Sequence, residues 1–349
     1  MENILEKLEN KKQEIKDEIK KEITEEFKKD RRKKQGKIII VGDGAVGSSF
    51  AYTLVAQDAA REIGIIDINA ERAEGDAMDL SNAVAYTRPK KIYRARYSDC
   101  EDAEIVAIAA GVPQKPGETR MDLLNNNIIV FKEIITKIVD SGFKGIFLIA
   151  TNPVDVLTYA TWKISGFSKE KVIGTGTTLD TARLRREIAE KLNIDTRNIH
   201  GYILGEHGDT EFPCWSQTNI AGVPLTTWLE ENEKESTMKE LDQIFHNVKN
   251  AAYEIINKKG ATYYGIAMSM TKICKTILND QGSILPISCY LDGHYGHSDL
   301  FIGSPAIIDG KGVRKVIEIE LNDLEKKQMD ISVKAVKDAI DECNIKNDY

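Results

Sequence analysis

The sequence predicts an α/β fold in which a doubly wound parallel sheet is followed by an α+β domain. Short runs of β-branched and other apolar residues, typical of strands buried on both faces, alternate with helical patterns in the first half of the chain. A GxGxxG turn joins the first of these runs to the first helix. The chain of 349 residues is long enough for two domains. We therefore divide it into an extension (1–36), a sheet domain (37–174) and an α+β domain (175–349).

The extension is predicted to be a charged helical arm. Its apolar residues are mostly four apart, which places them near one face of a helix: Ile4, Leu8, Ile15, Ile19, Ile23 and Phe27. Four-residue spacing drifts by about 40° per step, so the stripe is narrow and suits contact with a neighbouring subunit. A solvated extension is the alternative. The basic residues before Gly36 lie beside acids, which indicates a charged hinge.

The first strand is predicted over 37–41 and runs directly into the motif Gly42-Asp43-Gly44-Ala45-Val46-Gly47, which a helix over 48–57 follows. In this setting the first glycine permits a tight turn and the second lets the backbone approach a pyrophosphate. The third lets helix and strand pack closely. The pattern is that of a Rossmann-type dinucleotide site, although a glycine-rich turn without a ligand is the alternative.

A second apolar run ends in Asp67, about twenty residues after the glycine motif. A carboxylate at this place accepts hydrogen bonds from the adenine ribose and repels a 2′-phosphate. The sequence therefore predicts NAD as the cofactor in preference to NADP.

Further alternation completes a predicted sheet of about six strands. A helix over 73–82 is followed by strands near 92–97, 104–110, 145–150 and 171–174. Ligands of such sheets bind at the carboxyl ends of the strands. Asn152 stands at one of these ends before Pro153, where its amide could orient a substrate carbonyl and touch the cofactor. An ordinary Asn-Pro turn is the alternative.

The segment 111–120 is polar and contains glycines and prolines, so it is predicted to be a mobile loop over the site. Closure of such a loop would carry Arg120 to a reacting carbonyl, where its cation would stabilise alkoxide charge. A surface loop with a solvated arginine is the alternative.

The candidate catalytic group is His207, which lies between two glycines in the segment LGEHGDT (204–210). Imidazole titrates near neutral pH and can give or take a proton at working pH. Asp180 and Arg183 share one face of a predicted helix at i and i+3. A carboxylate on Nδ1 would fix the tautomer of His207, and a guanidinium one turn away could grip a substrate carboxylate. The alternative is that His207 is an ordinary loop histidine and that Asp180 and Arg183 form a surface ion pair.

The last part of the chain predicts the remaining elements of the α+β domain. A helix starts within 259–266, where Thr262 is placed to line a small pocket, and strands over 287–291 and 301–308 precede a helix over 321–340. His294 and His297 are interpreted as part of a hairpin turn, since no third ligand stands at a recognised spacing. We therefore predict no metal site.

Composition narrows the class of protein. The net charge of −7 argues against a nucleic-acid surface, and no apolar run is long enough to cross a bilayer. The amino terminus begins with charged residues instead of an apolar leader. The five cysteines show no metal-binding spacing, which indicates buried thiols in a reducing compartment and hence the cytoplasm.

With these motifs in this order, the chain from residue 37 onward resembles the NAD-dependent L-lactate dehydrogenases of the lactate/malate dehydrogenase family. The resemblance implies that His207 donates and accepts the proton, that Asp180 orients it, that Arg183 binds the substrate carboxylate and that Arg120 polarises the carbonyl. It also implies a homotetramer. The residues expected to contact the cofactor are Gly42, Gly44, Val46, Gly47, Asp67, Arg72, Gly111, Val112, Asn152 and Thr175.

The choice between lactate and malate depends on Gln114. In the family this position holds glutamine in lactate dehydrogenases and arginine in malate dehydrogenases, because a buried arginine demands a second substrate carboxylate. The expected reaction is the reduction of pyruvate to (S)-lactate by NADH in fermentative glycolysis, with Gln114, Arg120, Asn152, Arg183 and Thr262 binding the substrate. Malate dehydrogenase is the alternative, and an NAD-dependent glycosidase-like hydrolase is a remote one.

Two further residues predict regulation. Arg185 and His200 match the positions that bind fructose 1,6-bisphosphate in regulated bacterial members of the family. Both side chains suit a dianionic phosphate. A surface ion pair for Arg185 and a strand-end role for His200 are the alternative.

Overall fold

The computed structural model describes residues 36–112, 117, 119–232, 238–343 and 345, together with the isolated residues Lys11 and Lys16. The chain divides into two compact units, 1–36 and 37–349, and the second is described below. The predicted arm lies outside the described residues, apart from the two isolated lysines and Gly36.

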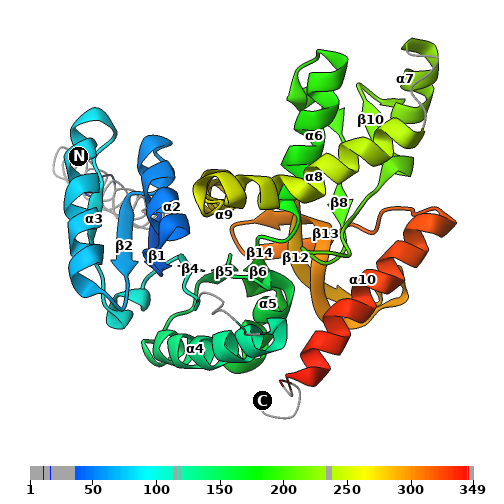
Figure 1. Cartoon of the computed structure of the whole chain (residues 1–349). Coiled ribbons are helices and arrows are strands. Elements are labelled where there is room, and N and C mark those ends of the chain that lie inside the picture. The colour runs from blue at the N-terminus through cyan, green and yellow to red at the C-terminus, as the bar shows by residue number, and fades with distance from the viewer. Residues whose placement is uncertain are drawn as a thin grey trace, which may run out of the picture. The chain divides into compact units, whose positions relative to one another are not determined.

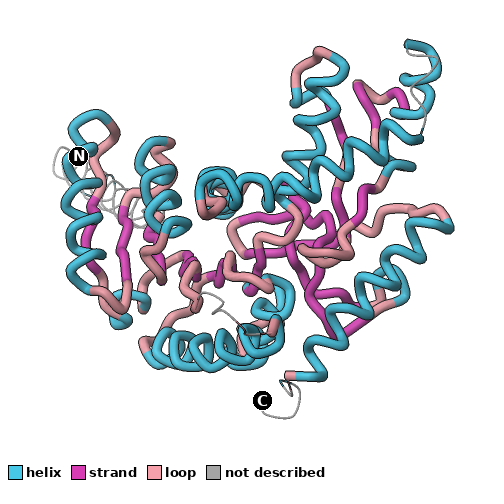
Figure 2. The backbone as a smooth tube through the Cα atoms, viewed as in Figure 1, coloured by secondary structure: helices cyan, strands magenta, loops and turns pink. Residues whose placement is uncertain are grey.

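A nine-stranded sheet forms the centre of the second unit, in the order β14-β13-β12-β6-β5-β4-β1-β2-β3 (Figures 1 and 2). Its strands are β1 (Lys37–Val41), β2 (Glu62–Ile66), β3 (Lys91–Arg94), β4 (Ile105–Ile108), β5 (Ile146–Ile149), β6 (Val172–Gly174), β12 (Ser283–Asp292), β13 (Ser298–Asp309) and β14 (Gly312–Val316). The six strands from β6 to β3 are parallel, which confirms the predicted doubly wound sheet.

The sheet does not stop at six strands. Ser288 of β12 pairs with Gly174 of β6 in an antiparallel bridge, and β13 and β14 continue the sheet in antiparallel pairing. The second half of the chain thus extends the sheet that the first half begins. Residues from both halves are therefore held by one continuous sheet. The predicted hairpin around His294 and His297 is confirmed as the turn between β12 and β13.

The helices of the second unit are α2 (Ala45–Ala56), α3 (Ala70–Asn82), α4 (Arg120–Asp140), α5 (Val154–Ser165), α6 (Thr178–Leu192), α7 (Leu225–Asn232), α8 (Met238–Lys259), α9 (Tyr264–Leu278) and α10 (Asp323–Glu342). In Figure 1, α4 and α5 lie on one side of the sheet and α9 on the other. Five two-residue strands complete the unit: β7 (Ile199–His200), β8 (Ile203–Leu204), β9 (Phe212–Pro213), β10 (Asn219–Ile220) and β11 (Val223–Pro224).

Burial explains why the parallel strands form where the sequence predicts them. Every residue of β1 is buried, as are all residues of β4, β5 and β6. Strands covered on both faces require continuous apolar runs. Gly64 of β2 allows close packing, because a Cβ there would lie 2.5 Å from the Ile39 side chain.

Some predicted boundaries are wrong. Helix α2 begins at Ala45, inside the glycine motif, and β3 ends at Arg94 because Tyr97–Cys100 forms a 3₁₀ turn. Helix α8 was not predicted, although its buried Leu241, Ile244 and Val248 stand at helical spacing.

Candidate active site

The loop that carries His207 is anchored from several directions. The His207 N–H donates to Asp155 Oδ2 at 2.8 Å, and the Glu206 N–H donates to Ser332 Oγ at 2.6 Å. Gly205 and Gly303 exchange two backbone hydrogen bonds, of 3.0 and 2.9 Å. Gly205 has a φ of +94°, and a Cβ there would lie 2.5 Å from Ser332 Oγ. Glycine is therefore required at this turn, and the histidine backbone is held in place.

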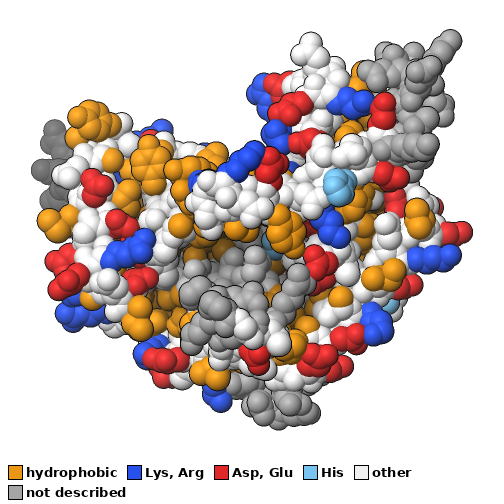
Figure 3. Space-filling view, viewed as in Figure 1, with side chains coloured by type: hydrophobic (Ala, Val, Ile, Leu, Met, Phe, Trp, Pro, Cys, Tyr) orange, Lys and Arg blue, Asp and Glu red, His pale blue; other side chains and the backbone are white. Residues whose placement is uncertain are grey.

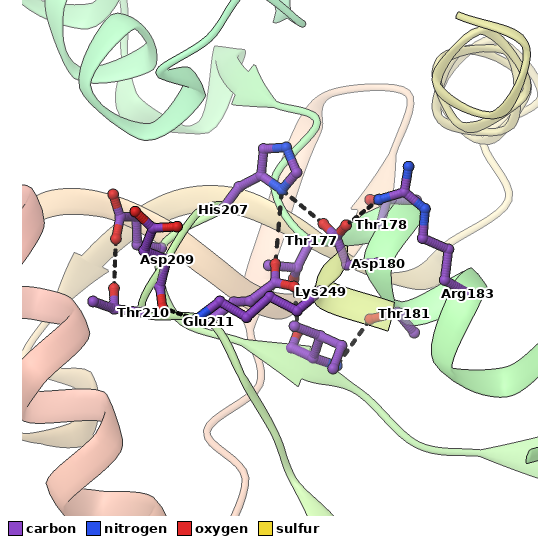
Figure 4. Close-up of polar contacts among 12 residues, drawn as sticks. Thr177, Thr178, Asp180, Thr181, Arg183, His207, Asp209, Thr210, Glu211 and Lys249 are labelled. Atoms are coloured by element: carbon purple, nitrogen blue, oxygen red, sulfur yellow. Dashed lines mark hydrogen bonds and ion pairs between the residues drawn. The ribbon is translucent and has the colours of Figure 1, made fainter. Parts of the chain in front are cut away.

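The His207 imidazole points toward Asp180, as predicted (Figure 4). Its Nδ1 lies 2.7 Å from Asp180 Oδ2, and the Asp180 side chain is buried. Arg183 NH1 donates to the other carboxylate oxygen of Asp180, at 2.9 Å. The structure thus brings these three residues together from two segments of the chain. A quarter of the His207 side chain stays exposed, and the second ring nitrogen points away from Asp180 in Figure 4.

The neighbours of His207 hold it in the protonated form. Burial alone lowers the pKa of His207, but the attraction and hydrogen bond of Asp180, with Glu211 and Asp155 behind it, raise it to about 9. Burial would raise the pKa of Asp180, but His207 and Arg183 outweigh this effect and lower it. At neutral pH the pair is therefore an imidazolium beside a carboxylate, ready to donate a proton.

Two threonines, one just before α6 and one in its first turns, hold the helix that carries Asp180 in place. Thr177 Oγ1 donates to the Ile203 carbonyl at 2.6 Å, and the Ile203 N–H donates to Thr181 Oγ1 at 2.9 Å. Strand β8 begins at Ile203 and leads directly into the histidine loop. These bonds fix the distance between the helix that carries Asp180 and the loop that carries His207.

Two carboxylates of this site were not predicted. Asp155 on α5 is buried and also accepts a hydrogen bond from Ser288 Oγ, and burial raises its pKa to about 6. Glu211 lies 3.9 Å from His207 Nδ1, measured from Oε2, and only 5% of its side chain is exposed. Glu211 directly follows the 204–210 segment that singled out His207, and Asp155 is distant from it in sequence.

Asp180, His207 and Glu211 lie close enough to suggest a metal site, since one ligand atom of each falls within 4.8 Å of the others. The 2.7 Å between His207 Nδ1 and Asp180 Oδ2 is a hydrogen-bond distance. Ligand atoms around a tetrahedral zinc ion lie roughly 3.4 Å apart. The geometry is therefore that of a proton-transfer pair, and we assign no metal to it.

The glycine motif has the shape that a dinucleotide requires. A Cβ on Gly42 would lie 2.4 Å from the Ala110 nitrogen, and one on Gly47 would lie 1.8 Å from the Gly42 oxygen. A Cβ on Gly44 would meet nothing within 4 Å, so this glycine leaves open space at the start of α2. Asp67 lies at the end of β2 and accepts the Asp43 N–H at 2.6 Å and the Asn69 N–H at 2.8 Å. These residues fit a pyrophosphate and a ribose.

Asp43, inside the same motif, was not singled out from the sequence. It is fully buried, and neither carboxylate oxygen has a hydrogen-bond partner among the described residues. Burial and the neighbouring Asp76 raise its pKa to about 7.

Other predicted cofactor residues lie at the carboxyl ends of the strands. The Val112 N–H donates to Asn127 Oδ1 at 2.9 Å, and a Cβ on Gly111 would lie 2.7 Å from Thr151, the residue before Asn152. The Thr175 N–H donates to the Ile149 carbonyl at 2.8 Å. Gly111, Asn152 and Thr175 thus follow neighbouring strands β4, β5 and β6. Arg72 lies in the first turn of α3 and Val46 in that of α2.

The other predicted substrate residues are Gln114, Arg120 and Thr262. Gln114 lies outside the described residues, and Arg120 is the first residue of α4. Thr262 lies in the turn between α8 and α9 and is half-buried. A Cβ on Gly265, three residues later, would lie 2.8 Å from Leu179, next to Asp180, so this turn approaches the start of α6.

The two predicted effector residues share one region of the second unit. Arg185 Nε donates to the Gly201 carbonyl at 3.0 Å, and its guanidinium lies 5.3 Å from the centre of the Tyr202 ring. His200 precedes Gly201 and is exposed at the end of β7.

The cysteines and the helices of the described residues agree with two other features of the sequence. All five cysteines are free thiols, and all but Cys343 are buried. Among the described residues, no helix has the length and apolar character to cross a bilayer.

Comparison with known proteins places the chain in a family. The model of the lactate/malate dehydrogenase NAD-binding domain matches residues 36–174, and that of the lactate/malate dehydrogenase alpha/beta C-terminal domain matches 177–346. The chain is 58% identical to L-lactate dehydrogenase 1 of Enterococcus faecalis over 309 residues, 88% of this chain and 94% of the relative. It is 57% identical to L-lactate dehydrogenase 1 of Listeria monocytogenes over 310 residues, 89% of this chain and 98% of the relative.

Solved structures of lactate dehydrogenases resemble this chain as well. The minor L-lactate dehydrogenase of Enterococcus mundtii, in its ligands-bound form, matches with a TM-score of 0.86 and 47% identity over 88% of this chain and 98% of that one. The fold and the site define an NAD-binding oxidoreductase. The chain belongs to the lactate/malate dehydrogenase family. The predicted fold class, family and cofactor are thereby confirmed.

Proposed function

We propose that this chain reduces pyruvate to (S)-lactate with NADH, and runs the reverse reaction, through a proton carried by His207. Identities of 54–58% to L-lactate dehydrogenases over about nine-tenths of the chain confirm the lactate prediction over the malate alternative. The fold and the lactate dehydrogenase relatives leave no support for the remote hydrolase alternative. The place of the reaction is fermentative glycolysis, where it regenerates NAD.

The observation that carries the assignment is the 2.7 Å contact between His207 Nδ1 and buried Asp180. Asp180 fixes the imidazole so that Nε2 faces the substrate with a proton. NADH, when bound, supplies the hydride to the carbonyl carbon. His207 donates its proton to the carbonyl oxygen, and the imidazole left behind remains hydrogen-bonded to Asp180.

The remaining residues bind and polarise the substrate. Arg183 presents a guanidinium, held through NH1 on Asp180, to the substrate carboxylate. Arg120 stabilises the developing alkoxide, and Asn152 orients the carbonyl. Gln114 contacts the methyl end of pyruvate, and Thr262 lines the pocket from the turn before α9. The hydrogen bond from Arg183 to Asp180, the approach of Gly265 to Leu179 at the start of α6, and the family pattern support these roles.

The cofactor occupies the carboxyl ends of β1, β2, β4 and β5 in this proposal. The open space at Gly44 takes the pyrophosphate, where the start of α2 offers backbone N–H groups. Asp67 accepts the ribose hydroxyls in place of the backbone N–H groups it now binds. Val46, Arg72, Gly111, Val112, Asn152 and Thr175 line the rest of the site.

The test is NADH oxidation with pyruvate against oxaloacetate at equal concentrations. The proposal expects a clear preference in kcat/KM for pyruvate. A preference for oxaloacetate would reassign the chain to the malate branch of its family.

The proposed assembly is a homotetramer. Three large side chains on α2 and α9 stay exposed in the single chain, Tyr52 at 59%, Tyr264 at 66% and Met268 at 50%. The two helices abut, since Gln57 Nε2 lies 3.0 Å from Met268 Sδ. Figure 3 shows apolar side chains gathered over α2. Such a patch supports contact between subunits, and sedimentation of the purified protein measures the assembly directly.

Fructose 1,6-bisphosphate is the proposed effector. Arg185 donates to the carbonyl of Gly201, the residue that follows the exposed His200, which supports a shared anion site for the two side chains. Arg185 would give up its present hydrogen bond to the Gly201 carbonyl to bind a phosphate.

The free thiols and the reaction itself support the cytoplasm as the proposed location.

A further inference from the structure

The group behind the catalytic pair is a second buried carboxyl, Glu211. Its Oε2 lies 3.9 Å from His207 Nδ1, on the same nitrogen that meets Asp180 (Figure 4). Its side chain is 5% exposed, and it stands one residue before β9. A carboxyl group so buried beside a carboxylate and an imidazole acts on both through the low local dielectric.

We propose that Glu211 is a positioning residue whose buried carboxyl group, 3.9 Å from His207 Nδ1, supports the protonated form of His207 together with Asp180. The proposal rests on the proposed function, in which protonated His207 is the form that binds pyruvate and reduces it. It adds a third group to the pair of His207 and Asp180.

The charged groups around Glu211 support this behaviour. Asp180 on α6 opposes its ionisation, whereas His207, Arg183 on α6 and Lys249 on α8 favour it. Burial has the largest effect, and the balance raises the pKa of Glu211 to about 8. Lys249 is itself held by the Asp209 carbonyl, at 2.5 Å. Asp155 adds a further carboxyl on the backbone side of His207.

The direction of the expected effect on the pKa of His207 follows from the charge that Glu211 gains when it ionises. Below about pH 8 Glu211 is neutral, and Asp180, with Asp155 on the backbone side, balances the imidazolium. Above that pH the new negative charge, 3.9 Å from Nδ1, favours the protonated imidazole. A neutral residue at position 211 would remove this second support, so His207 would lose its proton at lower pH.

The test is an NMR titration of the His207 imidazole in the NADH complex, with its signal identified by its loss in His207→Gln. Glu211→Gln should lower the pKa of His207 by about one unit or more. Glu211→Met, which tests the same loss without a polar group, should give a shift in the same direction. Glu211→Asp should restore most of the wild-type value. Glu254→Gln, the same change on an exposed carboxylate of α8, should leave it unchanged.

Kinetics provide the second readout. The alkaline fall of kcat/KM for pyruvate should move to lower pH in Glu211→Gln, while the value at pH 6 stays within about twofold of wild type. An unchanged His207 pKa in both Glu211→Gln and Glu211→Met would overturn the proposal. Full activity of His207→Gln would instead overturn the proposed function, so the two failures are distinguishable.

Discussion

His207 and Arg183 divide the carboxylate of Asp180 between them, His207 on Oδ2 at 2.7 Å and Arg183 on Oδ1 at 2.9 Å. One buried anion therefore orients both the proposed proton donor and the proposed substrate anchor. Removing its charge should disturb both functions together.

Asp180→Asn should lower kcat/KM for pyruvate by about 10²-fold or more, because the amide stabilises the imidazolium poorly and leaves the charge of Arg183 unbalanced. The pKa of His207 should fall in the same variant, since Asp180 is the main group that raises it. Steady-state kinetics across the pH range measure both effects. Activity close to that of wild type at every pH would contradict the role of Asp180.

Gln114→Arg should shift preference toward oxaloacetate. The new cation pairs with the second carboxylate of oxaloacetate and faces the methyl group of pyruvate without a partner. Because an unpaired charge in a closed site costs several kcal/mol, the ratio of kcat/KM values should change by more than about tenfold. A smaller change would require another position for Gln114.

Asp43→Asn should stabilise the cofactor-free protein at pH 8. Burial and Asp76 raise the pKa of Asp43 to about 7, so the folded protein favours the protonated carboxyl group. The free energy of unfolding therefore decreases as the pH rises toward 7. The gain at pH 8 should be about 2–4 kcal/mol, and smaller at pH 5. Thermal unfolding at the two pH values measures the difference, with the exposed Asp79→Asn as control. An equal effect of Asp43→Asn at both pH values would argue against a strained carboxylate.

Arg185→Gln should abolish activation by fructose 1,6-bisphosphate and leave the activity without effector nearly unchanged. Coupling of about 1–3 kcal/mol would lower the apparent KM of the wild type for pyruvate about 5–150-fold. Saturation curves near neutral pH in phosphate-free buffer, with and without millimolar effector, measure it. Identical wild-type saturation curves with and without the effector would contradict an effector site at Arg185.

Much of the fold was predictable because the signals are local. Continuous runs such as 37–41 record burial on both faces, and the glycine motif fixes a turn through steric limits at Gly42 and Gly47. The addition of β12 to the edge of β6 was not predicted. It depends on one antiparallel contact between Ser288 and Gly174, more than a hundred residues apart.

The site was predictable where its residues lie in short, recognisable sequence patterns. His207, Asp180 and Arg183 were found from their types, their i and i+3 spacing and the family pattern. Asp155 was missed because its hydrogen bond to the His207 backbone joins α5 to a loop 52 residues away. Asp43 was passed over because the sequence reveals its place in the motif but not its burial.

Single-turnover oxidation of bound NADH by pyruvate in His207→Gln measures whether His207 donates the proton to the substrate carbonyl. General acid catalysis contributes about 10²–10⁴-fold, so the rate should fall by a factor of that size with NADH binding preserved. Hydride transfer in this variant at a rate near that of wild type would contradict this role of His207.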